Sequence, residues 1–196
     1  MDAITMLKTD HDKVKQLLTE LESTTERGVK TRAELFSTIK GELTVHEIIE
    51  EEIFYPALKS HPKAKDIVLE AFEEHHVVDL LMSELEELDV TDETWGAKAI
   101  VMKENIEHHI EEEEGEMFRQ ARRVFDRQEL DDLGERMSAR KASAQLHCAT
   151  RFQIDWVRQH TTDVRRQVVP RLAAKRLRKR VAPLRDVAAH DAATRR

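Results

Sequence analysis

The sequence predicts an all-α protein: an antiparallel up-down-up-down four-helix bundle with a short fifth helix and a basic C-terminal extension. The chain contains only 5 glycines and 4 prolines among 196 residues, too few for the many turns of an all-β fold. Charged residues make up 36% of the chain and aromatic residues only 5%, a balance typical of long solvated helices around a narrow aliphatic core. Four long segments with helical spacing of apolar residues, separated by short breaks, indicate the bundle.

The first two helices begin at recognisable capping residues. The first is expected over about residues 3–23, with Asp2 as its N-cap. Its apolar residues follow helical spacing, at Leu7, Val14, Leu17, Leu18 and Leu21. The second helix is expected over about residues 31–59, opened by the capping box Thr31-x-x-Glu34.

Turn-forming residues mark the boundaries of the next helices. Pro56 is expected to disturb the last turn of the second helix, because proline lacks a backbone N–H. The third helix is expected over about residues 63–88. The fourth follows a cap at Thr91 or Asp92 and ends near Val124.

A shorter fifth helix is expected from Asp126, where Glu129 completes a capping box, to about Ala142. The composition changes soon after it. Residues 1–146 contain 19 Lys/Arg and 35 Asp/Glu, a charge of −16, whereas residues 147–196 contain 13 and 4, a charge of +9. The formal net charge of −7 is therefore the sum of two unlike parts.

We therefore expect a helical domain over residues 1–145 and a basic extension over residues 146–196, partly helical or disordered. The extension has no recognisable nucleic-acid-binding fold, so no clear nucleic-acid partner is predicted. The lone Cys148 argues against a disulfide framework or a multi-cysteine zinc site. The sequence shows neither a transmembrane run nor a signal peptide, so we expect a cytoplasmic protein without a membrane partner.

Four histidines fall at nearly one level of such a bundle. His11 lies about 14 residues before the first turn and His46 about 15 residues after it, roughly 21 and 22 Å along their helices. The second turn lies about 13 residues from both His46 and His75, and the third about 14 from His75 and about 17 from His109. Short connections make neighbouring helices antiparallel, so the four imidazoles are expected to meet.

An internal repeat selects the carboxylates that accompany these histidines. HDKVKQLLTELE, which starts at His11, matches HHVVDLLMSELE, which starts at His75. HEIIEEEIFYPA, which starts at His46, matches HIEEEEGEMFRQA, which starts at His109. Each copy thus supplies one lone histidine and one His-x-x-x-Glu pair. Together the two copies give a set of six residues: His11, His46, Glu50, His75, His109 and Glu113.

These six side chains project from apolar helix faces toward one another. Carboxylates rarely enter a bundle core unless they are paired or bound to a metal. Two carboxylates and four imidazoles suit two cations, with the carboxylates able to bridge and the imidazoles terminal. Non-haem iron fits this set best, and zinc and manganese are compatible with the residue types.

Other polar residues lie beside this set. His76 and His108 are each adjacent to one of the four histidines and point about 100° away from it, so we expect them next to the site and not in it. The phenol of Tyr55 could be an additional iron ligand if the turn at Pro56 swings it inward. The further candidates for ligation or for contact with the ligands are Glu47, Glu51, Glu112 and Glu114.

Over about residues 3–142 the chain resembles the hemerythrin-like, HHE cation-binding family. The resemblance rests on the order His, His-x-x-x-Glu, His, His-x-x-x-Glu and on the strings HEIIEEEIFYPAL, EEHHVVDLLMSELE and HHIEEEEGEMF. It implies a four-helix bundle that holds two non-haem iron ions, bridged by an oxo or hydroxo group. By the same resemblance the ligands would be His11, His46, Glu50, His75, His109 and Glu113, with Glu50 and Glu113 as bridges.

The sequence also departs from the oxygen-carrying members of that family. They have a second histidine four residues after the third-helix histidine, where this chain has Asp79. They also have an aspartate five residues after the fourth-helix histidine, where this chain has Glu113 at +4 and Glu114 at +5. One fewer histidine and more carboxylate should favour ferric iron. This favours peroxide handling, sensing or iron-linked stress roles over reversible oxygen carriage.

Three functions remain open at this stage. The first is a di-iron protein that reacts with peroxide or oxygen, with catalase-like peroxide decomposition as its enzymatic form. The second is a protein that binds or senses oxygen, nitric oxide or iron without turnover. The third is a metal-free helical interaction module with a basic tail. The sequence does not predict an oligomeric state.

Overall fold

The computed structural model describes residues 1–25 and 27–147, and these are helical, without a strand. The all-α prediction is confirmed. The chain forms α1 (Ala3–Glu22), α2 (Val29–Ile49), the π-helical turn η1 (Glu50–Phe54), α3 (Tyr55–Lys59), the 3₁₀ turn η2 (Pro62–Ala64) and α4 (Lys65–Glu87). It continues through α5 (Trp95–Glu112), the π-helical turn η3 (Glu113–Met117), α6 (Phe118–Val124) and a helical segment over residues 127–147.

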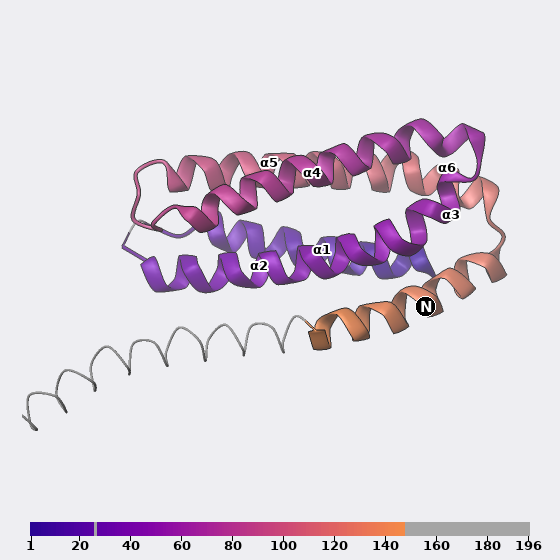
Figure 1. Cartoon of the computed structure of the whole chain (residues 1–196), viewed down its shortest axis with the longest axis horizontal. Coiled ribbons are helices and arrows are strands. Elements are labelled where there is room, and N and C mark those ends of the chain that lie inside the picture. Colours follow the sequence, from indigo (N-terminus) through magenta and orange to yellow (C-terminus); the bar gives the residue numbers. More distant parts are fainter. Residues whose placement is uncertain (26, 148–196) are drawn as a thin grey trace, which may run out of the picture. The chain divides into compact units, whose positions relative to one another are not determined.

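Figure 1 shows the long helices side by side, with short connections between them. Helix α1 packs against α2 and α5, and α4 packs against α5. The start of α1 lies against the segment 127–147, where Gly134 meets the backbone of residues 1–3. No helix among the described residues is long and apolar enough to cross a membrane.

The predicted caps of α1 and of the segment 127–147 are confirmed. The Asp2 carboxylate accepts a hydrogen bond from the Thr5 backbone N–H at 3.0 Å, which satisfies a free donor at the helix start. Asp126 and Glu129 form the reciprocal capping box, with N–H to carboxylate distances of 2.9 and 2.8 Å. The helix that they open reaches at least residue 147, beyond the expected end at Ala142.

The capping box at Thr31 is wrong. Helix α2 already begins at Val29, after Gly28, and its start has no side-chain cap. The Gly28 carbonyl accepts a hydrogen bond from the Arg32 N–H at 2.9 Å, so helical bonding begins ahead of the predicted start.

The fourth helix begins at Trp95, later than its predicted cap. Instead of capping a helix, the Asp92 carboxylate closes a turn, because it accepts hydrogen bonds from the backbone N–H and the hydroxyl of Thr94. The expectations for the extension beyond residue 147, Cys148 included, lie outside the described residues.

The second and fourth predicted helices are interrupted by π turns. In η1 the Tyr55 N–H bonds to the Glu50 carbonyl, and in η3 the Phe118 N–H bonds to the Glu113 carbonyl. Pro56 is the second residue after η1, and its missing N–H leaves the Glu52 carbonyl without an α-helical partner. Both π turns begin at the glutamate of a His-x-x-x-Glu pair, and such turns are frequent at functional sites.

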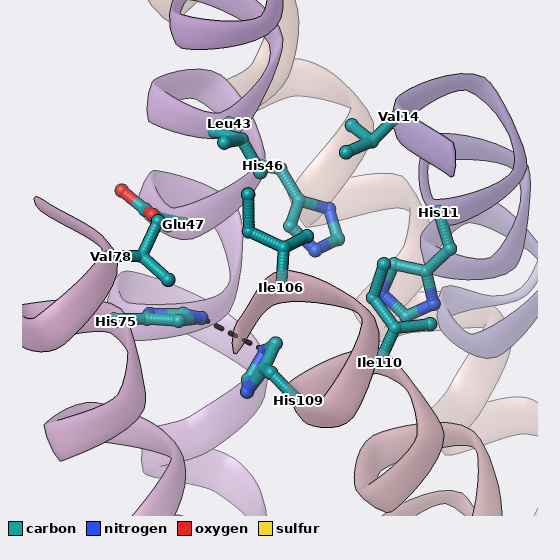
Figure 2. Close-up of a pocket in the computed structure, with 10 residues that line it drawn as sticks. All are labelled: His11, Val14, Leu43, His46, Glu47, His75, Val78, Ile106, His109 and Ile110. Atoms are coloured by element: carbon teal, nitrogen blue, oxygen red, sulfur yellow. Dashed lines mark hydrogen bonds between the residues drawn. The ribbon is translucent and has the colours of Figure 1, made fainter. Parts of the chain in front are cut away.

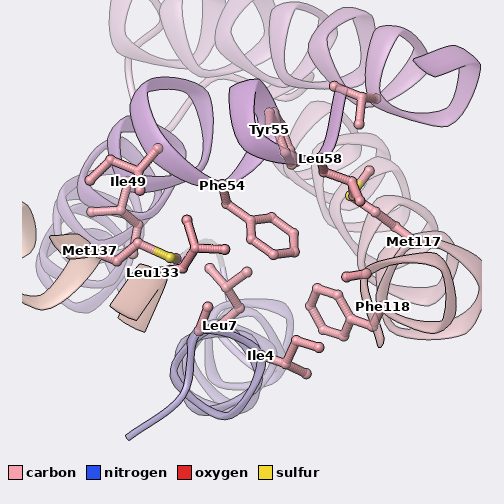
Figure 3. Close-up of a cluster of buried hydrophobic side chains, with 14 of the residues drawn as sticks. Ile4, Leu7, Ile49, Phe54, Tyr55, Leu58, Met117, Phe118, Leu133 and Met137 are labelled. Carbon is pink, nitrogen blue, oxygen red and sulfur yellow. The ribbon is translucent and has the colours of Figure 1, made fainter. Parts of the chain in front are cut away.

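Two apolar clusters fill the core on either side of a polar layer. The first contains residues such as Ile4, Leu7, Phe54, Leu58 and Phe118, and Figure 3 shows them converging from several helices. The second contains residues such as Leu18, Ile39, Met82, Trp95 and Met102. Trp95 is 1% exposed. The polar layer between the clusters contains the predicted histidines and glutamates.

Candidate metal centre

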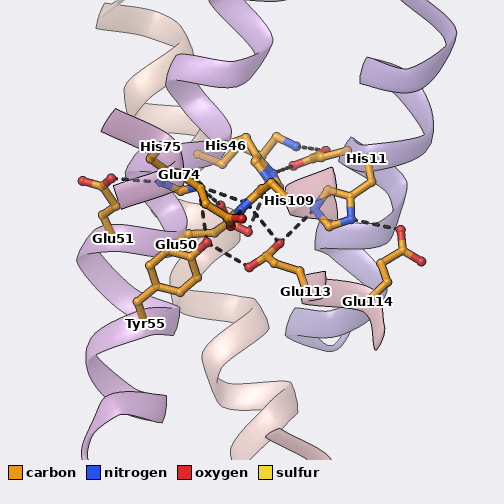
Figure 4. A network of polar contacts seen from close by, with 12 residues as sticks. His11, His46, Glu50, Glu51, Tyr55, Glu74, His75, His109, Glu113 and Glu114 are labelled. Carbon is orange, nitrogen blue, oxygen red and sulfur yellow. Dashed lines mark hydrogen bonds and ion pairs between the residues drawn. The ribbon is translucent and has the colours of Figure 1, made fainter. Parts of the chain in front are cut away.

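The structure brings all six predicted side chains into the interior of the bundle. They come from α1, α2, η1, α4, α5 and η3, and Figure 4 shows them pointing toward one another. None is more than 6% exposed: His11, His46, Glu50, His75, His109 and Glu113. The His11 and His46 rings are 4.9 Å apart between centroids, and the His75 and His109 rings are 4.7 Å apart.

The six residues form two groups, each of which could hold a metal ion. The first group is His11, His46, Glu50 and Glu113, and the second is Glu50, His75 and His109. Within each group, one ligand atom per residue lies within 4.8 Å of the others. Because Glu50 belongs to both groups, two cations in these positions would share a carboxylate.

The two carboxylates extend across both groups. Glu50 Oε1 lies 3.2 Å from His46 Nε2, and Glu50 Oε2 lies 3.4 Å from His75 Nε2. Glu113 Oε2 lies 3.2 Å from His11 Nε2 and 3.8 Å from His109 Nε2. Glu50 therefore has the position of a bridge between two cations, and Glu113 belongs to the first group and extends toward His109 of the second.

Several inner polar atoms are buried without a hydrogen-bond partner: His11 Nε2, both carboxylate oxygens of Glu50, and Glu113 Oε2. Burial and the neighbouring Glu113 carboxylate raise the pKa of Glu50 well above its usual value. Unpaired buried carboxylates are costly, and bound cations would remove that cost. Imidazole nitrogens and carboxylate oxygens suit iron, manganese and zinc.

Each of the four histidines also contacts a carboxylate on its outer side, through Nδ1. The distances are 3.1 Å for His11–Glu114, 3.6 Å for His46–Asp10, 3.0 Å for His75–Glu51 and 2.7 Å for His109–Glu74. We call these four the outer carboxylates. Such contacts orient an imidazole, so that Nε2 faces the centre, and they raise its basicity.

Sequence reasoning missed Asp10 and Glu74 as members of the site. A signal was present, because Asp10 directly precedes His11 and Glu74 directly precedes His75 at matching positions of the repeat. Glu51 and Glu114 were candidates for ligation or for contact with the ligands, and each contacts a histidine at its outer Nδ1.

Tyr55 and Phe118 occupy matching places in the two halves of the repeat, five residues after Glu50 and Glu113. The Tyr55 hydroxyl is buried, donates a hydrogen bond to Glu113 Oε1 at 2.9 Å and lies 3.3 Å from His75 Nε2. Burial and the carboxylates of Glu113 and Glu50 raise its pKa well above the usual value. The Phe118 ring instead stacks on His11, with centroids 6.0 Å apart.

Comparison with known proteins places this geometry in a family. The model of the Hemerythrin HHE cation binding domain matches residues 2–121. The chain belongs to this family. It is also similar to the crystal structure of a Hemerythrin HHE cation binding domain-containing protein, the Rv2633c homologue from Mycobacterium kansasii. The two chains share 27% sequence identity with a TM-score of 0.70, over 78% of this chain and 93% of the other. No curated protein sequence matches.

The remaining predicted neighbours of the HHE site lie nearer the surface. His76 is exposed. The His108 side chain is 65% exposed and lies 3.4 Å from Glu112 and 3.9 Å from Glu74. Glu47 is largely buried beside the histidines, and burial raises the pKa of its carboxyl to about 8.

The electrostatic surroundings of the histidines differ from one half of the HHE site to the other. Burial lowers the pKa of His46 to about 4. His75 is also buried, but its contacts with Glu50 and Glu51 outweigh this effect and raise its pKa to about 11. The surroundings of His75 are therefore the more negative.

A cavity of about 20 Å³ adjoins the four histidines (Figure 2). Its wall is otherwise mostly apolar and consists of Val14, Leu43, Glu47, Val78, Ile106 and Ile110. One water needs roughly 10–15 Å³ by a comparable measure, so the HHE site can admit a ligand of very few atoms.

Proposed function

We propose that this HHE domain is a non-haem di-iron protein that reacts with peroxide or oxygen, in a catalase-like or oxidative-stress role. In this proposal the domain spans about residues 1–145 as an antiparallel four-helix bundle. The iron ligands are His11, His46, Glu50, His75, His109 and Glu113, and Glu50 and Glu113 are the bridges. The observation that carries the proposal is the set of buried, unpartnered Nε2 and carboxylate atoms, arranged in two groups that share Glu50.

The surroundings of these residues support iron over redox-inert metals. The outer carboxylates strengthen the histidines as donors, and the Tyr55 hydroxyl places another oxygen beside His75. Both features favour a trivalent cation. Bound iron supplies the change of oxidation state that peroxide chemistry requires.

The proposed overall reaction consumes two molecules of hydrogen peroxide. One loses two electrons and two protons and becomes dioxygen, and the other gains them and becomes two molecules of water. The cavity next to the four histidines admits a molecule of this size, and its apolar wall excludes bulk water from the site. Glu47 on the cavity wall is placed to hold and return a proton.

Iron content and oxygen release test this function together. Purified protein expressed with iron should contain two iron ions per chain and release oxygen from peroxide. His46→Ala and Glu113→Ala should lose iron, because each removes an inner donor. His76→Ala is the matched control, since this exposed histidine is adjacent to His75 but belongs to none of the groups that could hold a metal, and it should keep its iron. Full iron content in the first two variants would contradict the ligand assignment.

The same cavity supports one alternative, a protein that binds or senses oxygen, nitric oxide or iron without turnover, because a space of this size also suits a diatomic ligand. Oxygen release distinguishes the two functions. Iron-loaded protein that binds nitric oxide but releases no oxygen from peroxide would support the alternative.

A further inference from the structure

The two halves of the site are built alike but surrounded differently. We define the first half as His11 and His46 with their outer carboxylates Glu114 and Asp10. The second half is His75 and His109 with their outer carboxylates Glu51 and Glu74. The repeat relates these halves, so any difference between them comes from residues that the repeat does not duplicate.

Lysines neutralise the outer carboxylates of the first half. Lys8 Nζ lies 3.0 Å from Glu114 Oε2, and Lys15 Nζ lies 3.4 Å from Glu114 Oε1. Lys141 forms an ion pair with Asp10 Oδ1. Lys141 belongs to the helical segment 127–147, which has no counterpart in the repeat.

The second half has no such neutralisation. In the described part of the chain, no ion pair joins Glu51 or Glu74 to a lysine or arginine. Among the described residues, their ion pairs are with histidines alone, including the exposed His108 at 3.9 Å from Glu74. Glu47, a further carboxyl, also lies near His75.

One of the two repeat-related pairs of contact distances agrees with this difference, whereas the distances of His11–Glu114 (3.1 Å) and His75–Glu51 (3.0 Å) are alike. Asp10, which is paired with Lys141, lies 3.6 Å from His46 Nδ1, too far for a hydrogen bond. Glu74, its counterpart, lies 2.7 Å from His109 Nδ1. A carboxylate that is free of lysine accepts a stronger hydrogen bond from imidazole and makes it a better metal donor.

The aromatic residues add to the asymmetry. Tyr55 places an oxygen 3.3 Å from His75 Nε2, whereas Phe118 places only a ring face against His11. Apart from the inner carboxylates, of which Glu113 belongs to the first group alone, the second half therefore offers a cation more uncompensated outer negative charge and one more oxygen than the first half.

We propose that the two halves are unequal metal positions, and that Lys8, Lys15 and Lys141 make the first half the weaker and more easily reduced position. This inference rests on the proposed dimetal centre. The second half binds the first cation and retains the more oxidised iron. The first half exchanges its metal more readily, and iron held there would be the first to take up an electron from an added one-electron reductant. The lysines act through the outer carboxylates and are therefore positioning residues.

Cobalt(II) titration of the metal-free, full-length protein tests this inference without activity. Two cations that share carboxylates repel each other, so even two identical positions would bind in two unequal steps. Unequal steps in the wild-type protein therefore do not show that the halves differ. Variants decide whether the lysines weaken metal binding in the first half. Lys141→Met and Lys15→Met should each raise the cobalt affinity of the weaker step about tenfold and leave the affinity of the tighter step unchanged. Tenfold is the lower end of the changes in metal affinity that follow from altering such outer contacts. Lys13→Met is the matched control, since Lys13 also lies on α1 but pairs with Glu42 at 2.7 Å.

Repeat-related variants assign the steps to the halves. Glu51→Gln should weaken the tighter step, and its counterpart Glu114→Gln should weaken the other. In iron-loaded protein, Lys141→Met should shift the first one-electron reduction to lower potential, and Lys13→Met should not. The inference is overturned if Lys141→Met and Lys15→Met leave the weaker step unchanged, or if Glu51→Gln and Glu114→Gln weaken the same step. A wild-type chain that binds fewer than two cobalt ions would instead refute the dimetal centre.

Discussion

At the scale of single residues, the site shows a consistent arrangement of inner and outer donors. Every histidine of the centre has an outer carboxylate on Nδ1, at 2.7 to 3.6 Å, and an inner carboxylate near Nε2. The inner set was predictable, because the repeat and the i, i+4 spacing specify it. Asp10 and Glu74 were not singled out, since an acid beside a histidine in an acidic chain is not distinctive by itself.

Tyr55→Phe tests whether the phenol binds iron. Burial raises the pKa of Tyr55 in the metal-free site. A ferric ion bound by His75 would lie close to the Tyr55 hydroxyl and would favour the phenolate. We expect iron-loaded wild-type protein to show a visible ferric–phenolate absorption band, which Tyr55→Phe abolishes while iron content is kept. Tyr55 is the only tyrosine of the chain, so no other phenol can give this band. An unchanged spectrum would show that Tyr55 only donates a hydrogen bond to Glu113.

Glu47→Gln tests the proton carrier on the cavity wall. The carboxyl lines the cavity but belongs to neither of the buried donor groups, so iron content should be unchanged. The rate of oxygen release from peroxide should fall about 100-fold, which is the lower end of the rate losses that follow when an acid–base group is removed. Glu42→Gln, on the same helix but paired with Lys13, should release oxygen at the wild-type rate. Equal rates in the two variants would exclude a role for Glu47.

At the scale of elements, the two π turns determine which residues face the centre. An α-helix would place Tyr55 about 140° around from Glu50, at about 100° per residue. The wider π turn reduces this angle, so that the Tyr55 hydroxyl reaches Glu113. The sequence predicted both helices because their apolar spacing is strong, and it predicted a disturbance at Pro56. It could not predict the turn at η3, because no proline follows Glu113. Gly115 is no signal either, since the turn has room for a side chain at that position.

Gly134→Ala tests how the segment 127–147 packs against the start of α1. A Cβ atom at this position would collide with the Met1 carbonyl oxygen and lie 2.9 Å from the Ala3 backbone nitrogen. Backbone atoms cannot move aside as a flexible side chain does. The free energy of unfolding should therefore fall by about 1–3 kcal/mol, measured by urea denaturation.

Gly41→Ala is the control for this prediction. Gly41 lies within α2, and a Cβ atom there would meet nothing within 4 Å. Its replacement should stabilise the protein by roughly 0.5–1 kcal/mol, because alanine favours the helix. A Gly134→Ala variant as stable as wild type would mean that the segment does not pack closely on α1.

At the scale of the whole molecule, a layer of buried polar groups divides the apolar core in two. The cluster around Phe54 and Phe118 lies on one side, and the cluster around Trp95 and Met102 lies on the other. Composition alone predicted the helical class, and helix lengths predicted that four histidines would meet at one level. The ion pair between Lys141 and Asp10 was beyond sequence reasoning, because it joins residues 131 positions apart through the packing of a segment outside the repeat.

This layered core makes the stability of the whole protein depend on metal. Without cations, the inner donors of Glu50, Glu113 and His11 stay buried and unpaired, which opposes folding. A cation that binds only the folded chain adds about 2.7 kcal/mol when its concentration is 100 times the dissociation constant. For a chain of this size, that gain corresponds to a rise in Tm of roughly 5–11 °C. Far-ultraviolet circular dichroism of iron-loaded and chelator-treated protein measures it. The Glu50→Gln, Glu113→Gln double variant lacks both bridges, and its Tm should not respond to iron. Equal Tm values for loaded and metal-free wild-type protein would contradict coupling between metal binding and folding.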